Sequence, residues 1–357
     1  MGSEATLKLN GENVAIREGE NLRALSARMG VAIPTLCHDD RLKAFGGCRL
    51  CVVSLEGARN PVASCTTVAT DGMVVETHTP AIEQHRRTLL EMLASENPTV
   101  NRNDLTGFAG LEMADLIDEY SAATDRFAGA TSGTSRLDDL NPFIVRDYDA
   151  CISCYRCVRV CDEQEGDFAL TVVGRGFKTQ ISTAFDLDLR ESTCTFCGQC
   201  VQTCPTGALT DKKAVRATDL PGETEKTRSV CTYCGVGCAV DLLTRGDKLI
   251  GVQPAMDGPA NEGALCVKGQ FAYDFVQHDD RLKTPLIRDA NGKLQPATWD
   301  EALDAAAEGF RRAVEKHGAH SVYGIASGRA PHEAAYTMQK FMRAGFGTNQ
   351  IDNCSRA

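Results

Sequence analysis

The sequence is poor in aromatic residues and carries no excess of positive charge. Only 6% of its 357 residues are aromatic, one of them a tryptophan, and the formal net charge is −10. Nucleic-acid-binding surfaces are basic, so a nucleic acid is not expected as a partner. Long apolar runs are also missing, and no stretch approaches the ~20 residues of a membrane-spanning helix. Because the first ten residues lack the regions of a signal peptide, we expect a cytoplasmic protein without a membrane span.

Cysteine is the residue that the sequence has in excess. Sixteen of its 17 cysteines fall into four groups of four. In a chain without a secretion signal, this density indicates metal sites rather than disulfides. Thiolates are the ligands of iron–sulfur clusters, which would make the loaded protein more acidic than its formal charge.

The strongest signal is a cysteine run that occurs twice. The spacing C-x2-C-x2-C-x3-C begins at Cys151 and again at Cys194. In two-cluster ferredoxins the fourth cysteine of each run binds the cluster of the other run. We therefore predict two [4Fe–4S] sites with these ligand sets: Cys151, Cys154, Cys157 and Cys204; and Cys194, Cys197, Cys200 and Cys161. Two zinc sites are the alternative, although zinc usually takes two separated C-x2-C pairs.

The first group has a wider spacing, C-x10-C-x2-C-x13-C, whose opening gap exceeds the four residues of the plant-type pattern. The pair Gly46-Gly47 lets the backbone approach a cluster closely. We predict a [2Fe–2S] site, with zinc as the alternative, on Cys37, Cys48, Cys51 and Cys65. We expect His38 to be a surface residue rather than a ligand.

The fourth group has the spacing C-x2-C-x3-C-x27-C, which by itself permits either zinc or an iron–sulfur cluster. Its members are Cys231, Cys234, Cys238 and Cys266. The remaining cysteine, Cys354, is expected to be a small buried residue without a catalytic role.

Residue patterns predict several helices and strands. A hairpin over 5–16 turns at Asn10-Gly11, a helix covers 20–29, and strands lie near 50–55 and 72–77, as in a plant-type ferredoxin. A further helix is expected over 81–94 and a linker over 121–135. Thr298 and Glu301 form a capping box that opens a helix ending near Gly318. A strand over 320–326 and a helix over 331–344 follow, like the start of an α/β domain.

Two sets of motifs resemble known families. Residues 1–205 resemble the N-terminal electron-transfer region shared by the G subunit of NADH-quinone oxidoreductase, iron hydrogenases and soluble NAD-linked formate dehydrogenases. From residue 231 onward there are three further motifs: Cys231-Thr-Tyr-Cys-Gly-Val-Gly-Cys238, Leu265-Cys-Val-Lys-Gly269 and Ile351-Asp-Asn-Cys-Ser-Arg. In these motifs the chain resembles molybdopterin oxidoreductases, and within them formate dehydrogenase alpha subunits.

This resemblance implies an α+β multidomain fold. It comprises a [2Fe–2S] ferredoxin (β-grasp) domain over 1–80 and a helical spacer and linker without a cluster over 81–140. A two-cluster [4Fe–4S] ferredoxin domain covers 141–216. The small [4Fe–4S] domain of molybdopterin oxidoreductases covers 225–285, and the start of the α/β molybdopterin domain covers 286–357. In relatives, a cluster on one histidine and three cysteines follows the first domain, but residues 95–116 contain neither residue type.

The resemblance also implies cofactors and partners. Cys231, Cys234, Cys238 and Cys266 would hold a third [4Fe–4S] cluster, and Lys268 would lie between it and the pterin, with a solvated surface lysine as the alternative. The parent protein would be an enzyme that oxidises formate to CO2 at a bis-molybdopterin guanine dinucleotide with molybdenum or tungsten. Its electrons would reach NAD through flavin- and NAD-binding diaphorase subunits.

In the family, the cysteine or selenocysteine that ligates the metal comes directly after the motif that ends this chain. It is expected at position 358, so no catalytic residue is expected within the chain, which should be inactive towards formate alone. The sequence could stop before this ligand for three reasons: a selenocysteine codon, a cloning boundary or a gene fragment. The alternative functions are another molybdopterin oxidoreductase, a protein like the G subunit of complex I, and a stand-alone electron carrier.

Overall fold

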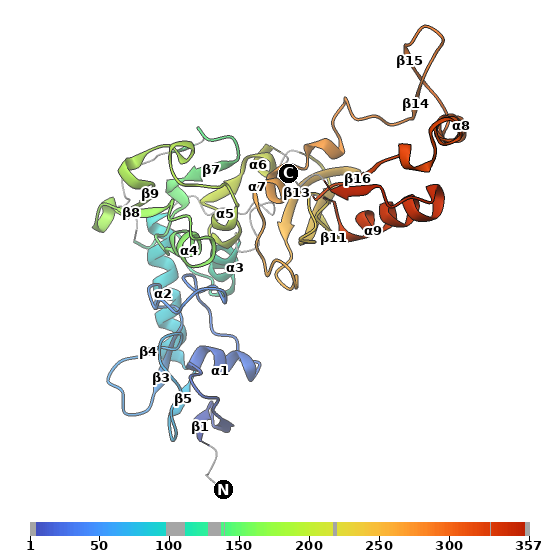
Figure 1. Ribbon diagram of the computed structural model, residues 1–357. Coiled ribbons are helices and arrows are strands. Elements are labelled where there is room, and N and C mark those ends of the chain that lie inside the picture. The colour runs from blue at the N-terminus through green and yellow to red at the C-terminus, as the bar shows by residue number, and fades with distance from the viewer. Residues whose placement is uncertain are drawn as a thin grey trace. The chain divides into compact units, whose positions relative to one another are not determined.

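The computed structural model describes residues 5–97, 111–127, 137–138, 140–216, 220–328 and 330–353. The chain forms two compact units, Met1–Thr224 and Glu225–Ala357. Figure 1 shows their helices and strands. Most of the predicted linker over 121–135 and the last cysteine lie outside the described residues. No helix within the described ranges is long and apolar enough to cross a membrane.

The first unit begins with a five-stranded sheet in the order β2-β1-β5-β3-β4. Its strands are β1 (Thr6–Leu9), β2 (Glu12–Ala15), β3 (Val52–Leu55), β4 (Val62–Ala63) and β5 (Val74–Glu76). β1 and β2 form the predicted hairpin, and Asn10 and Gly11 both have the positive φ that a two-residue turn needs. β1 pairs in parallel with β5. The two-residue strand β4 was not predicted, because so short a strand has no alternating pattern.

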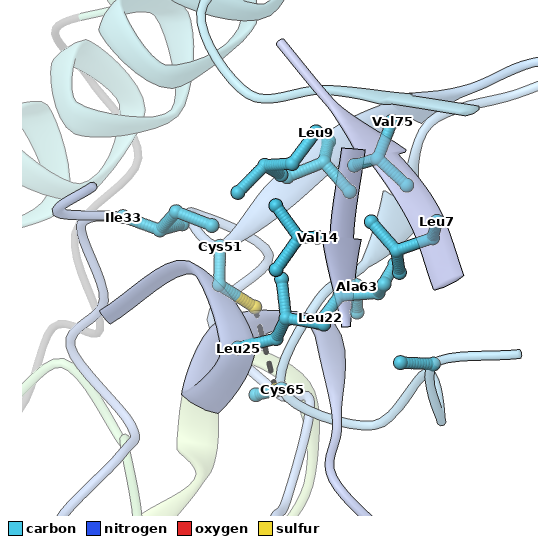
Figure 2. Packing of buried hydrophobic residues seen from close by; sticks show 12 residues of the cluster. Leu7, Leu9, Val14, Leu22, Leu25, Ile33, Cys51, Ala63, Cys65 and Val75 are labelled. Atoms are coloured by element: carbon cyan, nitrogen blue, oxygen red, sulfur yellow. Dashed lines mark hydrogen bonds between the residues drawn. The ribbon is translucent and has the colours of Figure 1, made fainter. Parts of the chain in front are cut away.

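Helix α1 (Leu22–Arg28) covers this sheet and confirms the helix expected over 20–29. The side chain of Asn21 caps it by accepting a hydrogen bond from the Ala24 amide at 2.9 Å. Figure 2 shows the apolar core between helix and sheet, with Leu22, Leu25 and Val75 pointing into it. Cys51 and Cys65 belong to the same buried cluster, so half of the first predicted ligand set is anchored in a packed core.

Two helices, α2 (Pro80–Glu96) and α3 (Glu112–Glu119), come after the sheet in the chain. α2 confirms the helix expected over 81–94, and Figure 1 shows it in cyan, running from the blue strands towards α3 and α4. Leu90 on α2 and Ile117 on α3 pack in one buried cluster together with Leu36 and Leu50. Most of the described part of the predicted spacer is therefore helical, and its helices pack against residues of the first domain.

The cysteine-rich part of the first unit has an internal repeat. The short helices α4 (Arg156–Val160) and α5 (Gln199–Thr203) are related by the same offset of 43 residues as the cysteine runs (194 − 151). β10 (Leu209–Asp211), β7 (Ile144–Asp147) and β6 (Leu137–Asp138) form a small sheet. The hairpin of β8 (Thr171–Val173) and β9 (Gln180–Ser182) is inserted between the runs, and α6 (Lys212–Arg216) follows them.

The second unit opens with a three-stranded antiparallel sheet of β11 (Glu225–Val230), β12 (Ala239–Arg245) and β13 (Lys248–Pro254). Helix α7 (Val267–Phe271) packs against it. A hairpin of β14 (Leu286–Arg288) and β15 (Leu294–Pro296) leads to α8 (Trp299–His317). β16 (Gly324–Ala326) and β17 (Ile351–Asn353) pair in parallel, with α9 (His332–Phe341) between them in the chain.

The predicted capping box is confirmed: the Thr298 side chain accepts from the Glu301 amide, and Glu301 accepts from the Thr298 amide at 2.8 Å. Gly318 ends α8 with a φ of +81°, a conformation that favours glycine. The strand expected over 320–326 is shorter than predicted, because a 3-10 turn over Ala319–Ser321 takes its first residues. Strand β16, helix α9 and strand β17 confirm the start of an α/β domain.

Candidate iron–sulfur sites

The four cysteines of the first group lie in two pairs. The Sγ atoms of Cys51 and Cys65 are 3.3 Å apart, and Figure 2 shows these side chains pointing towards one another. The Cys48 amide donates to Cys37 Sγ at 3.4 Å. Hydrogen bonding with Cys37 lowers the pKa of Cys48 to about 5, and hydrogen bonding with Cys65 lowers the pKa of Cys51 to about 7. One thiol of each pair is thus ready to act as a thiolate ligand.

The two cysteine runs wrap their predicted sites with the same backbone turns. Ser153 and Phe196 have positive φ values of 51° and 56°, and so do Tyr155 and Gly198, at 62° and 79°, just before the two helices. These left-handed residues reverse the chain between cysteines. The repeat in sequence therefore becomes a repeat in loop geometry.

The structure places the fourth cysteine of the second run beside the first run. A single cavity is lined by all four members of one predicted ligand set, Cys151, Cys154, Cys157 and Cys204, and by apolar residues such as Ile152, Ile181 and Leu209. Burial raises the pKa of Cys151 to about 11 and that of Cys154 to about 12, and the charge of a Cys204 thiolate adds to both shifts.

The reverse crossing occurs at the other ligand set. Burial raises the pKa of Cys194 to about 11, and the charge of a Cys161 thiolate adds to the shift. Cys161 acts on Cys200 in the same way. The Ala169 amide donates to Cys161 Sγ at 3.3 Å, and the Phe196 amide donates to Cys194 Sγ at 3.4 Å. Amide donors of this kind stabilise the negative sulfurs of iron–sulfur sites.

The fourth group lies in the second unit, in the turn between β11 and β12 and at the start of α7. The Cys231 amide donates to the Cys238 carbonyl at 2.8 Å, which closes the turn. Cys266 caps the N-terminus of α7. Burial raises the pKa of Cys238, and charges on Cys231, Cys234 and Cys266 add to the shift. The other three cysteines are therefore near enough to Cys238 for their charges to affect it.

Lys268 lies on α7 next to this group. Its Nζ is 5.8 Å from the centre of the Tyr233 ring, between two of the cysteines in sequence. Burial raises the pKa of Cys231, and the positive charge of Lys268 opposes that shift. Lys268 thus places a positive charge near the predicted cluster site, and the role beside the pterin that the resemblance implies stays a prediction.

The donor set fits iron–sulfur clusters in several ways. The cysteines are free thiols, and most of them are buried or half-buried. Buried thiols with raised pKa values stay protonated at neutral pH until a metal replaces the protons. Within the described residues, no group of three or more histidine, cysteine or acidic side chains forms a site for a metal ion. The cluster ligands therefore remain predictions that rest on the cysteine pairs, the shared cavity and the turns.

One histidine differs from the sequence expectation, and a second has contacts that the sequence does not indicate. The His38 side chain is only 11% exposed, so it is not a surface residue, and its Nε2 lies 2.9 Å from Asp40. His78 contacts Glu83 at 2.8 Å and the Ala32 carbonyl at 3.1 Å. Both histidine side chains therefore have polar partners within hydrogen-bond distance.

Sequence reasoning missed a set of buried arginines around the sites. Arg86 is fully buried and donates to the carbonyls of Leu50 and Val52, on either side of Cys51. Arg156, directly before Cys157, forms a bidentate ion pair with Glu112 at 3.0 and 2.6 Å. Arg156 could have been noticed because it stands next to a predicted ligand, whereas Arg86 lies in a polar stretch far from any cysteine and has no such signal.

Four family models match successive parts of the chain. They are the 2Fe-2S iron-sulfur cluster binding domain at residues 2–80 and the ferredoxin-like domain of NADH-quinone oxidoreductase subunit 3 at 141–210. The molybdopterin oxidoreductase Fe4S4 domain matches at 224–278, and the molybdopterin oxidoreductase domain at 281–357. The fold class that the sequence predicts is confirmed by these matches.

Curated proteins are similar along nearly the whole chain. The NADH-quinone oxidoreductase G subunit 2 of Rhizobium meliloti (strain 1021) is 35% identical over 98% of this chain and 40% of its own length. NADPH-Fe(3+) oxidoreductase subunit alpha of Geobacter sulfurreducens (strain DL-1 / KN400) is 32% identical, with the same coverage. A protein of Staphylococcus aureus (strain USA300), named provisionally as a formate dehydrogenase, is 28% identical over 100% of this chain and 39% of its own length.

The chain thus spans about 40% of the length of the curated relatives that it matches. Among solved structures, a chain of the NAD+-reducing [NiFe]-hydrogenase in its H2-reduced state is 29% identical with a TM-score of 0.52. That match covers 59% of this chain and 88% of the hydrogenase chain. The chain is therefore an iron–sulfur region of the molybdopterin oxidoreductase type, similar to the G subunit of NADH-quinone oxidoreductase.

Proposed function

We propose that the chain carries single electrons through one [2Fe–2S] and three [4Fe–4S] sites in the alpha subunit of a formate dehydrogenase. The observation that carries this proposal is that Cys204 of the second run lines one cavity together with three cysteines of the first run. Bound clusters would supply one-electron oxidation and reduction. The chain supplies thiolate ligands, amide donors to sulfur and an apolar surround.

The two crossed ligand sets adjoin one another, which suits transfer between them. Cys157 belongs to one predicted set and Cys200 to the other. After the larger effects of burial and of thiols in its own set, the charge of a Cys200 thiolate adds to the raised pKa of Cys157. The charge of a Cys204 thiolate, from the first set, adds in the same way to the raised pKa of Cys200. The helices that carry them, α4 and α5, are in contact. Two redox sites held this close can exchange electrons without a mobile carrier.

We propose that electrons enter at the site of Cys231 and Cys266, beside Lys268, and leave near the site of Cys37. In the whole protein, a bis-molybdopterin guanine dinucleotide with molybdenum or tungsten would act on formate. Names of relatives include NADH, NADPH and NAD+ as reactants. These names support flavin- and NAD-binding diaphorase subunits as partners, and we place the complex in the cytoplasm.

A role like that of the G subunit in an NADH-quinone oxidoreductase is the second candidate. The observation in its favour is that the G-subunit relative is 35% identical, whereas the relative named provisionally as a formate dehydrogenase is 28% identical. Both candidates use the same four iron–sulfur sites and differ in the reaction that supplies or removes the electrons.

An assay on the native complex separates the candidates. The complex is purified anaerobically from its own cells and mixed with NAD and formate. Formate-dependent formation of NADH supports the formate dehydrogenase. NADH-dependent quinone reduction without a response to formate supports the role of a G subunit. A colourless preparation without inorganic sulfide contradicts both, because zinc on cysteine is colourless and needs no sulfide.

A further inference from the structure

The ten residues between Cys37 and Cys48 contact the two ferredoxin helices. We call residues 38–47 the docking loop; it is the opening gap that is longer than in the plant-type cysteine spacing. In the first unit this loop contacts the helical segments that come after the predicted ligands Cys154 and Cys197. We propose that the docking loop seats the [2Fe–2S] site on these helices and that Arg159 is its positioning residue. This inference rests on the proposed function.

One end of the loop is bound to α5. The Thr203 hydroxyl donates to Asp39 at 2.7 Å, a contact that is buried. Arg41 Nη1 donates to the Gln199 side chain at 2.7 Å, and Arg41 also forms an ion pair with Asp39 at 2.8 Å. Gln199 and Thr203 are one helical turn apart and therefore share a face of α5. The loop binds that face with a carboxylate and a guanidinium.

The other end of the loop is bound to α4 and to the π-helical turn Cys161–Glu165 that continues it. The Lys43 amide donates to Glu163 at 2.7 Å, and the Phe45 ring packs edge-on against Tyr155 with 5.6 Å between ring centres. Arg159 lies between these contacts, four residues after Tyr155, which directly precedes α4, and four residues before Glu163 on the π-helical turn.

Arg159 joins the loop at both of its ends. Its Nη1 donates to the carbonyl of Cys37 at 3.0 Å, and its Nη2 donates to the carbonyl of Lys43. Its guanidinium lies 5.1 Å from the centre of the Phe45 ring. On its own helix, Arg159 stands between Cys157 and Cys161, which are predicted ligands of different clusters. The Arg159 side chain thus connects Cys37, a predicted ligand of the first site, to the segment that carries Cys157 and Cys161.

The first site and its neighbour border the same space. A cavity of about 390 Å³ is lined by Cys37 and Cys48 of the first group and by Cys154 of the second, together with Phe45 and Tyr155. Electron transfer between buried centres becomes slower as the distance between them grows. A loop that holds the first site at a fixed distance from its neighbour therefore also sets the rate of transfer between the two. Arg159 therefore acts on transfer through position, without touching the iron.

Gly47 makes this packing possible. A Cβ at residue 47 would lie 2.5 Å from Cε1 of Phe45, too close for the ring to keep its place against Tyr155. The glycine before Cys48 therefore serves the docking contact as well as the close approach to a cluster that the sequence suggests.

The test uses the full chain, purified anaerobically with its clusters, as wild type and as Arg159→Gln, Arg159→Lys and Arg41→Met. Arg190→Gln is the matched control, because Arg190 is 58% exposed and pairs with Asp188. Hydrogen exchange of the 38–47 amides should be about tenfold faster in Arg159→Gln and Arg41→Met, since each loses charge-assisted hydrogen bonds. Arg159→Lys should restore part of the protection, and the control should not differ from wild type.

The second readout is electron spin relaxation of the [2Fe–2S] signal, which a nearby reduced cubane speeds up. In Arg159→Gln the iron and sulfide contents should stay unchanged while this effect weakens. Unchanged exchange and relaxation in Arg159→Gln would overturn the docking role, as would equal changes in the control. If the wild type holds no iron, the proposed function fails, whereas hydrogen exchange still decides whether the loop is docked.

Discussion

The sulfur atoms of Cys51 and Cys65 lie 3.3 Å apart in the core of the first domain, one directly before β3 and the other after β4. Replacing Cys65 with serine should remove the [2Fe–2S] site alone, because the other three groups share no residue with it. We expect a loss of about two iron atoms per chain and of the [2Fe–2S] resonance, with the cubane resonances retained. Loss of all signals together would contradict four separate sites.

Replacing Cys161 with serine tests the crossing of the runs. On the crossed assignment this change damages the cluster of Cys194, Cys197 and Cys200, although Cys161 stands in the first run. Cys204→Ser should instead damage the cluster of Cys151, Cys154 and Cys157. Mössbauer spectra of the two variants, with iron and sulfide analysis, distinguish the losses. If Cys161→Ser damages the cluster of its own run, the crossed assignment is wrong.

Replacing Arg86 with methionine should destabilise the first unit. The buried guanidinium donates to the Leu50 and Val52 carbonyls at 3.1 and 3.0 Å, and methionine would leave both acceptors unpaired. The expected loss in the free energy of unfolding is about 2 to 4 kcal/mol. Denaturant unfolding followed by circular dichroism measures it. Arg87→Met is the control, because Arg87 is 47% exposed and the buried Glu91 keeps its second ion pair, with Arg126.

Truncating Leu90 to alanine should be costly, whereas the same change at Met92 should not. Leu90 is fully buried between α2 and α3, and Met92 on the same helix is 46% exposed. We expect about 2 to 4 kcal/mol for Leu90→Ala and less than about 1 kcal/mol for Met92→Ala. Equal effects on thermal unfolding would show that α2 does not join the domains through this cluster.

Much of the local structure depends on short-range chemistry and could be predicted. The turn at Asn10-Gly11 needs only residues that accept a positive φ, and the capping box needs only Thr298 and Glu301. The bounds of α8 were predicted as well, yet Trp299 is 69% exposed and no residue of that helix is buried. End signals predict where a helix starts and stops but not what packs against it.

The contacts around the sites could not be predicted in the same way. Asp39 and Thr203 are 164 residues apart in the chain, and neither residue type is fixed by a cysteine spacing. Tyr155, Arg159 and Glu163 have helical spacing, but this spacing is common to every exposed helix face. Cysteine spacing predicts which metal chemistry a chain can hold, whereas long-range contacts decide how the sites are held together.

The crossed cysteine runs have a consequence for synthesis. If Cys204 completes the site that begins at Cys151, no cubane can close there until the ribosome has released the second run. Both clusters would then be inserted into one finished fold, and a chain broken between the runs would carry neither.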